Sequence, residues 1–389
     1  MSLYNERGVS AQKEDVHAAI KKLDAGLFPK AFCKMYPDFL GADEAFVNIM
    51  HADGAGTKSI LAYLYWKETG DVSVWKGIAQ DAIVMNLDDL LCVGVYDNIV
   101  FNSTIDRNKK LIPAEVLEQV INGSQEVFDQ LKSFGINIHY LGGETADVGD
   151  VVRTIAVNGT MTCRCPKQKI ITNEKIQAGD VIVGFSSFGQ CVYENEYNSG
   201  LGSNGLTSAR HDVLNKYYAE QYPETYEPTL SKDVVYIGKY KMTDTVNVGN
   251  ETVNIGKMLL SPTRTYAPVL KILLEQYFDD IHGLIHCSGG GQTKCLKYVP
   301  DNVRIVKDNL FTPPPIFDII QKAGKADDRE MYQVFNMGCR MEVYTPESAA
   351  DNMIAAARQF GIDAQIIGRV EPAHKTSLVI QTNKAAITY

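Results

Sequence analysis

Residues 45–70 combine a short apolar strand, a glycine-containing loop and a helix, and this succession limits the fold more than any other feature. "AFVNIMHA" has the composition of a short apolar strand, and "KSILAYLYWKETG" has helical periodicity that ends at a glycine. The loop between them, "HADGAGTKS" (51–59), is similar to a Walker A loop. However, Thr57 precedes Lys58 where a glycine is required, and Ala52 stands where the first glycine belongs. The loop is a degraded P-loop, a plain turn, or a different way of holding nucleotide phosphates.

The same alternation of strands and helices continues along the chain and predicts an α/β protein. Strands are predicted at 96–105, 136–143, 151–164, 181–189, 284–291, 338–344 and 364–370, and the strand at 136–143 is expected to be buried. Helices are predicted at 72–94, 113–135 and 347–361, from Ser203, after Pro262 and near Phe317.

A charged, turn-rich stretch, "CPKQKIITNEKIQAGD", separates the two series of elements and predicts a domain boundary. We therefore expect an N-terminal domain at 1–167 and a C-terminal domain at 168–389. Within the second domain, residues near 190–201 and 217–253 have the character of insertions.

The charge balance and the cysteines indicate which classes of partner and compartment to expect. A net charge of -9 argues against binding to nucleic acids or to anionic membranes, although a small phosphorylated ligand remains compatible with it. No stretch approaches the roughly 18 consecutive apolar residues of a membrane span, and the N-terminus lacks an apolar signal segment. The eight cysteines are scattered, which is typical of reduced thiols in a cytoplasmic protein.

Five acidic residues lie at positions from which their side chains could form one site. Asp53 follows the first strand, and Glu144 follows a pair of glycines in "LGGETADVG". Asp81 and Asp88 are seven residues apart on one predicted helix, so both point to the same face, and Asp89 lies beside it.

Acids at strand ends and beside glycines are typical of a site for a hard cation and a phosphate. Mg²⁺ prefers oxygen ligands, glycines allow backbone amides to approach phosphate oxygens, and Lys58 could neutralise a phosphate charge. The alternative is that these acids form turns and a solvated helix face. Asp81 argues against this alternative because it stands among apolar residues in "IAQDAIVM".

The motifs of the chain, taken in order, resemble the aminoimidazole ribonucleotide synthetase family, also called phosphoribosylformylglycinamidine cyclo-ligases. The resemblance rests on "DGAGTK" (53–58), Asp81 with "DDL" (88–90), "GGETA" (142–146), "SNG" (203–205), "LLSPTRTY" (259–266), "HCSGGG" (286–291) and "EMYQVFNMG" (330–338). It extends from about residue 4 to about residue 370. The first and third motifs occur across the wider superfamily, whereas "EMYQVFNMG" and "PTRTY" point to this family.

This resemblance implies a PurM-like fold, a reaction and an assembly. Family members are homodimers whose N-terminal sheets close into a barrel, with an α/β C-terminal domain packed outside. The implied activity is the ATP-dependent cyclisation of formylglycinamidine ribonucleotide to aminoimidazole ribonucleotide, with release of ADP and phosphate, in purine biosynthesis. The implied cofactors are ATP and Mg²⁺.

The matched positions also imply roles for individual residues. The implied metal ligands are Asp53, Asp81, Asp89 and Glu144, and the implied ATP contacts are Asp53, Gly54, Gly56, Thr57, Lys58, Asp88, Gly142 and Gly143. The implied substrate contacts are Ser203, Asn204, Arg264, Gly289, Gly290 and Gly291, and the implied catalytic residues are His286 and Lys58. The alternatives are a structural histidine at 286, an arginine at 264 that only anchors its helix, and a triple glycine that only forms a turn. Tyr332 and Phe335 are expected in the core.

The chain departs from the family pattern where a histidine usually precedes "SNG", because Gly202 occupies that position. Tyr193, Tyr197 or His51 are candidates to replace this histidine. A second departure is Asp88, which replaces an asparagine of the family motif. These departures leave two alternative functions open: another ATP-using enzyme, similar to thiamine monophosphate kinase or selenophosphate synthetase, and a non-catalytic nucleotide-binding protein.

Overall fold

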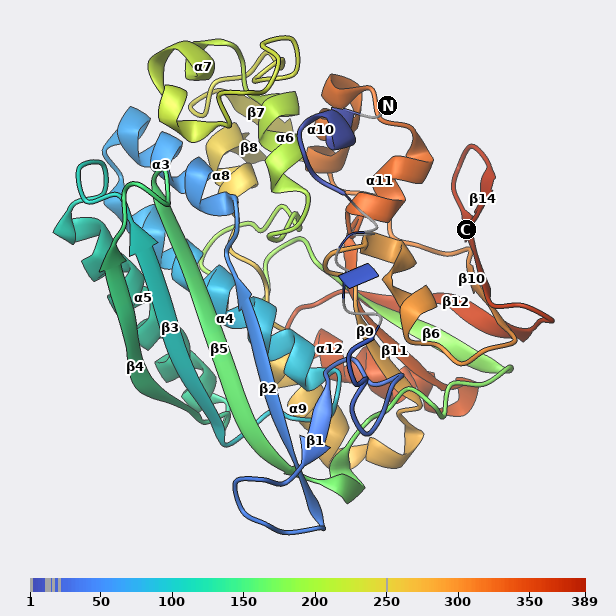
Figure 1. Ribbon diagram of the computed structural model, residues 1–389. Coiled ribbons are helices and arrows are strands. Elements are labelled where there is room, and N and C mark those ends of the chain that lie inside the picture. The colour runs from blue at the N-terminus through green and yellow to red at the C-terminus, as the bar shows by residue number, and fades with distance from the viewer. Residues whose placement is uncertain (1–2, 11–14, 16–17, 20–21, 250) are drawn as a thin grey trace.

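The structure is a computed structural model that describes residues 3–10, 15, 18–19, 22–249 and 251–389. Its described strands form one five-stranded sheet, one seven-stranded sheet and a small hairpin. Figure 1 shows the two large sheets on opposite sides of the molecule, with α4 (Trp75–Leu91) between them.

The first sheet is built from the N-terminal half of the chain. Its strands are β1 (Met35–Pro37), β2 (Phe46–Gly54), β3 (Ile99–Arg107), β4 (Ile138–Asp147) and β5 (Ile155–Pro166), in the order β1-β2-β5-β3-β4. The β3–β4 pair is parallel and the other pairs are antiparallel.

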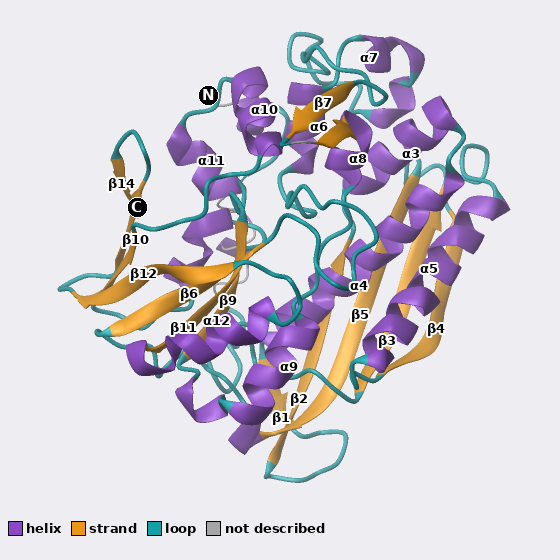
Figure 2. Ribbon diagram, turned by 180° about the vertical axis from the view of Figure 1, so that it is seen from behind, coloured by secondary structure: helices purple, strands orange, loops and turns teal. Residues whose placement is uncertain are grey.

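Among the described residues, helices cover one face of this sheet (Figure 1 and Figure 2). The helical segments of this half are α3 (Lys58–Thr69), η1 (Val72–Val74), α4 and α5 (Ala114–Ser133), and α4 packs on β2 and β5. The strands stand in front of α4 and α5 in Figure 1, and the helices stand in front of the strands in Figure 2. The opposite face exposes apolar side chains, including Met50 of β2 and Leu141 of β4.

The second sheet comes from the C-terminal half and has the order β14-β13-β10-β12-β6-β11-β9. Its strands are β6 (Asp180–Ser186), β9 (Gly283–His286), β10 (Val303–Lys307), β11 (Cys339–Pro346), β12 (Ala364–Pro372), β13 (Ser377–Gln381) and β14 (Ala386–Thr388). Its pairs are antiparallel except β10–β13, which is parallel. The central strands β6 and β11 are buried along almost their whole length, and α12 (Ala350–Arg358) packs on β6, β11 and β12. Helix α9 (Ala267–Gln276) packs against α12 and α4.

Shorter elements complete the second half and the N-terminus. The helices are α1 (Leu3–Glu6), α6 (Leu206–Val213), α7 (Tyr217–Gln221), α8 (Ile255–Leu260), α10 (Pro315–Gly324) and α11 (Asp328–Val334). The 3₁₀ turns are η2 (Lys167–Lys169), η3 (Pro223–Thr225), η4 (Phe278–Asp280), η5 (Gly291–Lys297) and η6 (Glu347–Ala349), and the hairpin is β7 (Thr245–Val248) with β8 (Glu251–Asn254).

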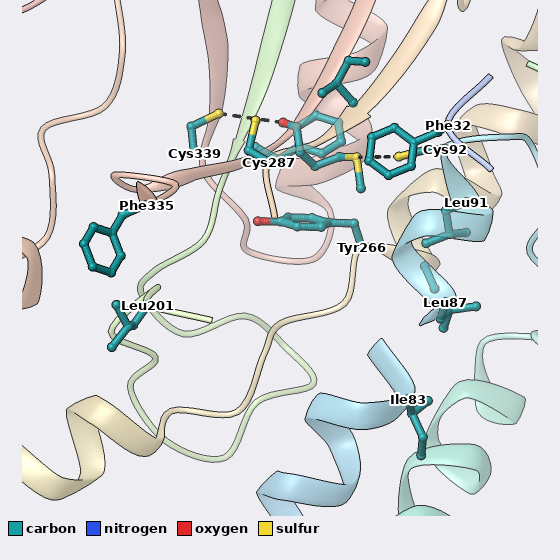
Figure 3. Packing of buried hydrophobic residues seen from close by; sticks show 14 of the residues in the cluster. Phe32, Ile83, Leu87, Leu91, Cys92, Leu201, Tyr266, Cys287, Phe335 and Cys339 are labelled. Carbon is teal, nitrogen blue, oxygen red and sulfur yellow. Dashed lines mark hydrogen bonds between the residues drawn. The ribbon is translucent and has the colours of Figure 1, made fainter. Parts of the chain in front are cut away.

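The core runs without interruption from α4 into the second sheet. Figure 3 shows Leu87 and Leu91 of α4 on one side of Tyr266, with Leu201 and Phe335 on the other side. Tyr332 and Phe335 are buried, which confirms their expected place in the core. All eight cysteines are buried and free, as expected for reduced thiols.

The prediction of a buried strand at 136–143 is wrong in both burial and length. β4 is an edge strand that continues through the two glycines to Asp147, and most of its residues are exposed. The apolar letters of "INIHYL" suggested burial, but an edge strand with one helix-covered face needs only alternate apolar residues.

His211 of α6 is a fully buried neutral histidine. Its Nδ1 accepts a hydrogen bond from the Tyr236 backbone N–H at 3.2 Å, and its Nε2 has no partner among the described residues. Burial, followed by the nearby Arg210 cation, lowers the pKa of His211 to about 2.

We expect His211 to make folding stability depend on pH. The folded-state pKa lies below the unfolded value of about 6.5, so stability is present above that pH and is lost as the pH falls. In urea titrations between pH 6.5 and pH 5, the free energy of unfolding should fall more steeply for the wild type than for His211→Asn, by an average of about 1.1 kcal/mol per pH unit. Parallel pH profiles would show that His211 is protonated in the folded state.

Candidate active site

Helix α4 places three carboxylates inside the molecule. Asp81, Asp88 and Asp89 are all buried, because α4 packs on the first sheet and also contacts β9 and α9. A buried carboxylate is stable only when hydrogen bonds or opposite charges compensate for lost water, so the partners of each acid define the site.

Asp81 connects the first glycine loop to the "PTR" segment. Its Oδ1 accepts hydrogen bonds from Lys58 Nζ at 2.9 Å and from the Thr263 backbone N–H at 2.8 Å. The Lys58 ammonium also donates to the Ser261 carbonyl at 2.6 Å and is fully buried. Thr263 Oγ1 lies 3.0 Å from Ser203 Oγ, so the "SNG" segment joins the same chain of contacts. Lys58 is therefore held in place and does not extend into open space.

Asp89 lies between two histidines. Its Oδ1 is 2.6 Å from His286 Nδ1, and its Oδ2 is 3.1 Å from His51 Nε2. A carboxylate only accepts hydrogen bonds, so His286 carries a proton on Nδ1, and the neutral ring presents an unprotonated Nε2. That Nε2 is buried and has no hydrogen-bond partner in the described part of the chain.

His51 is held from its other side by Asn86. Asn86 Nδ2 donates to the carbonyls of Asp53 and Gly159, both at 3.1 Å, which leaves its Oδ1 to accept from His51 Nδ1 at 2.9 Å. Both ring nitrogens of His51 thus donate, and His51 is an imidazolium paired with the Asp89 carboxylate.

The pKa shifts agree with this arrangement. Burial raises the pKa of Asp89, but the hydrogen bonds from His286 and His51 outweigh burial and hold it well below its ordinary value. Burial lowers the pKa of His51, but the hydrogen bond and charge of Asp89, together with the hydrogen bond to Asn86 and the charge of Asp53, raise it above its ordinary value. Burial and then the Arg340 cation lower the pKa of His286 to about 4, so His286 is neutral near pH 7.

Asp88 belongs to the same buried group but has a different character. Burial raises its pKa to about 7, although the Arg340 cation and a hydrogen bond from Thr265 oppose the rise. Thr265 Oγ1 donates to Asp88 Oδ1 at 2.7 Å, and Asp88 Oδ2 has no partner among the described residues.

The glycine motifs of the second half meet one another. A Cβ at Gly289 would lie 3.5 Å from Asn204 Nδ2, so the triple glycine contacts the "SNG" segment. Gly291 has a positive φ, and a Cβ there would lie 2.4 Å from the Phe335 carbonyl oxygen, which only glycine avoids. Gly290 also has a positive φ and begins the turn η5.

The first glycine loop approaches the same region. Asp53 lies in β2, and its Oδ1 accepts from the Gly54 backbone N–H at 2.7 Å. Gly56 has a positive φ with open space around it, and Thr57 Oγ1 lies 2.9 Å from Thr207 Oγ1 beside "SNG".

Arg264 is fully occupied by structural contacts. Its Nε and Nη2 pair with the two carboxylate oxygens of Glu194 at 2.9 and 2.5 Å, and its Nη1 donates to the carbonyls of Ser186 and Phe188. Tyr193 Oη donates to the Thr265 carbonyl at 2.6 Å. The segment near 190–201 is thus anchored beside the site, and Arg264 holds it there.

Glu144, Gly142 and Gly143 do not join the buried acids. Glu144 pairs in register with Thr104, on the uncovered face of the first sheet, whereas Asp53 lies in the adjacent row on the helix-covered face. Among the described residues, no three or more His, Cys, Asp or Glu side chains form a group that could hold a metal ion. The predicted metal ligands are therefore not brought together within one chain, because Asp81 is paired with Lys58 and Asp89 with two histidines.

The sequence reasoning overlooked two polar residues of the site. Asn86 stands in "IVMNLDDL", where a buried amide among apolar helix residues was a usable signal. Arg340 stands in the strand "GCRMEVY", and its place beside the site depends on tertiary packing that no local pattern shows.

The comparisons with known proteins match both halves of the chain. Residues 41–165 match the family described as AIR synthase related protein, N-terminal domain, and residues 177–381 match its C-terminal domain. The chain belongs to the AIR synthase related protein family.

Similar proteins of this family carry one name. A phosphoribosylformylglycinamidine cyclo-ligase of Methanocaldococcus jannaschii is 30% identical and covers 100% of this chain and 98% of its own length. A protein of the same name from Bacillus cereus is 28% identical over 93% of this chain and 90% of its own length.

Solved structures share the fold at low sequence identity. AaThiL complexed with AMPPCP and TMP has a TM-score of 0.55 and 12% identity, and covers 94% of this chain and 93% of that chain. A chain of the HypE–HypF complex has a TM-score of 0.53 and 11% identity, and the match covers 97% of this chain and 99% of that chain. These likenesses concern the fold alone.

Proposed function

We propose that this member of the AIR synthase related family is a phosphoribosylformylglycinamidine cyclo-ligase. It uses ATP to cyclise formylglycinamidine ribonucleotide to aminoimidazole ribonucleotide and releases ADP and phosphate. The observation that carries this proposal is the meeting of the motif segments around α4, where Asp81 and Asp89 contact residues from the first glycine loop, "PTR" and "HCSGGG".

The reaction needs activation of the formyl oxygen and removal of a proton from the nitrogen that closes the ring. An amide oxygen is a poor leaving group, and phosphorylation of the formyl oxygen by ATP makes it a good one. The neighbouring amidine nitrogen then closes the five-membered ring and loses a proton. A site that orients both ligands and excludes water supplies most of the required acceleration.

His286 is the residue that we assign to proton transfer. Asp89 fixes the proton on Nδ1, so Nε2 holds a lone pair that no described residue uses. His51 keeps the Asp89 carboxylate ionised and oriented from the opposite side. Lys58 is assigned as a positioning residue, because its ammonium is held by Asp81 and the Ser261 carbonyl.

ATP and Mg²⁺ are the proposed cofactors, and a binding segment can be named for ATP but not for Mg²⁺. The first glycine loop, with Gly54 and Gly56, is the proposed contact for the ATP phosphates. Mg²⁺ would neutralise charge on the transferring phosphoryl group. Its ligands remain a prediction, because the acids named from the sequence are not gathered in one chain.

A homodimer through the uncovered face of the first sheet is the proposed assembly. This face exposes Met50 by 71% and Leu141 by 68%, and it also carries Glu144. Apolar side chains on an uncovered sheet face are typical of an interface. No helix among the described residues is long and apolar enough to span a membrane. We propose the cytoplasm as the compartment, because the substrates are soluble phosphorylated metabolites.

Met50→Lys is expected to shift the protein from dimer to monomer, because the ammonium would have to be buried in the interface. Light scattering should then give a mass near the chain mass of 43.1 kDa in place of about twice that value. Val192→Lys, at an exposed position outside this face, is the matched control and should stay dimeric. Equal masses for the wild type and both variants would rule out this interface.

Rescue of a purine-requiring strain that lacks the cyclo-ligase is the test of the proposed function. The wild-type gene should restore growth without purines, and an empty vector should not. Failure to rescue, together with ATP hydrolysis that thiamine monophosphate stimulates, would instead support a kinase of the same superfamily.

A further inference from the structure

Arg340 of β11 is a buried cation whose guanidinium contacts no carboxylate among the described residues. Only 2% of Arg340 is exposed to solvent. Nη1 lies 3.4 Å from the Arg264 carbonyl, and Nη2 lies 3.6 Å from Met85 Sδ. In the described part of the chain, no carboxylate oxygen lies within 4.0 Å of its guanidinium nitrogens.

Most other buried cations among the described residues have carboxylate partners, and Arg210 instead donates hydrogen bonds to the Thr225 carbonyl and the Tyr236 hydroxyl. Arg7 pairs with Asp212, Arg264 pairs with Glu194, and Lys307 pairs with Glu342. Burying a guanidinium against only a carbonyl and a thioether is costly, because neither neutral group replaces the lost hydration. Within the part of the chain that the structure describes, Arg340 lacks both a carboxylate contact and short hydrogen bonds of this kind, so its guanidinium keeps N–H donors for the oxygens of an anion.

Gly202 explains how the guanidinium fits. A Cβ at Gly202 would lie 3.6 Å from Arg340 Nη1 and 3.7 Å from both Cζ and Nε. The near-equal distances mean that the flat face of the guanidinium lies against the glycine. A Cβ at position 202 would thus be in ordinary contact with the guanidinium, and the positive φ of Gly202 disfavours any longer side chain there. The missing histidine before "SNG" and the presence of Arg340 are thus two parts of one arrangement.

Arg340 also stands among the motif segments of the proposed active site. Gly202 directly precedes Ser203, Arg264 belongs to "PTR", and Met85 comes from α4. Its positive charge also acts on two buried groups of the site. Burial raises the pKa of Asp88, and the charge of Arg340 opposes this rise. Burial lowers the pKa of His286, and the charge of Arg340 lowers it further.

We propose that Arg340 binds phosphoryl oxygens in the active site and takes the place of the family histidine at position 202. This inference rests on the proposed function. A guanidinium presents a planar set of N–H donors that matches two oxygens of a phosphoryl group. The phosphoryl group belongs either to the terminal phosphate of ATP or to the phosphate of the ribonucleotide.

Calorimetric binding measurements on the full-length protein test this proposal. The ligands are AMPPCP, ADP and formylglycinamidine ribonucleotide, and the proteins are the wild type, Arg340→Met, Arg340→Lys and the exposed-site control Arg369→Met. Arg340→Met should weaken binding of the recognised ligand by about 10- to 100-fold, because a charge-assisted hydrogen bond is lost. Arg340→Lys should show a smaller loss, and Arg369→Met should bind like the wild type.

The three ligands distinguish the two sources of the phosphoryl group. Weaker binding of AMPPCP with unchanged ADP assigns Arg340 to the terminal phosphate, and weaker binding of the ribonucleotide assigns it to the substrate phosphate. All three affinities within twofold of the wild type, with a lowered unfolding temperature, would overturn the proposal and make Arg340 structural. Binding requires no turnover, so a wild type that binds these ligands without cyclisation would refute the proposed function and leave this test intact.

Discussion

Asp89→Asn is expected to lower kcat/KM for cyclisation by about 10²–10⁴-fold, the contribution of a well-placed acid–base group. The two Asp89 oxygens accept from His286 at 2.6 Å and from His51 at 3.1 Å. An asparagine can accept from only one of the two histidines, because its amide nitrogen is a donor. The histidine that faces the amide nitrogen must then lose its proton or its position, and the chain of contacts from His51 through residue 89 to His286 is broken.

Steady-state assays of ADP release with the ribonucleotide substrate measure this effect. Asp129→Asn on α5 is the matched control, because its side chain lies in an exposed helical pair with Gln125. Circular dichroism should show that both variants are folded. An Asp89→Asn enzyme within threefold of the wild type would remove Asp89 and its histidines from the mechanism.

Lys307→Met is expected to cause the largest loss of stability. Lys307 and Glu342 are fully buried and form an ion pair inside the second sheet, and Lys307 Nζ also donates to Gln292 Oε1 at 3.0 Å. Glu342 Oε2 accepts from Tyr344 Oη at 2.9 Å. Removing the lysine leaves a carboxylate buried without a counter-charge, which costs about 3–5 kcal/mol. The thermal unfolding temperature should fall by about 4–6 °C.

The double variant Lys307→Met/Glu342→Gln separates the charge effect from the packing effect. It removes both charges and should recover a large part of the loss, because an uncharged pair avoids the cost of an unpaired carboxylate. Lys322→Met, in an exposed pair with Asp318, is the control and should change stability by less than about 1 kcal/mol. A double variant as unstable as Lys307→Met would show that packing, and not charge, determines the loss.

The local part of the site could be predicted from the sequence because it depends on spacing. The strand, loop and helix around Asp53 and Lys58 were confirmed as β2 and α3. The acids of α4 could be placed on one helix from their spacing, and the apolar residues around Asp81 indicated that its side chain is not solvated. Short-range periodicity of this kind is set by backbone geometry alone.

The long-range part of the site could not be predicted in this way. The face on which Glu144 lies depends on strand register, since neighbouring residues of a strand point to opposite sides. The pairing of Arg264 with Glu194 joins residues 70 positions apart, and its geometry depends on how the segment near 190–201 packs. The same applies to Arg340 of β11, whose guanidinium lies beside Gly202, a residue far from it in the sequence.

The most direct test of the account is the product formed by the purified protein. Formylglycinamidine ribonucleotide, ATP and MgCl₂ are incubated with the enzyme, and the ribonucleotides are separated and identified by mass. We predict stoichiometric aminoimidazole ribonucleotide and ADP. ADP without the ring-closed product, or unchanged substrate beside an active reference cyclo-ligase, would contradict the assignment of this site to ring closure.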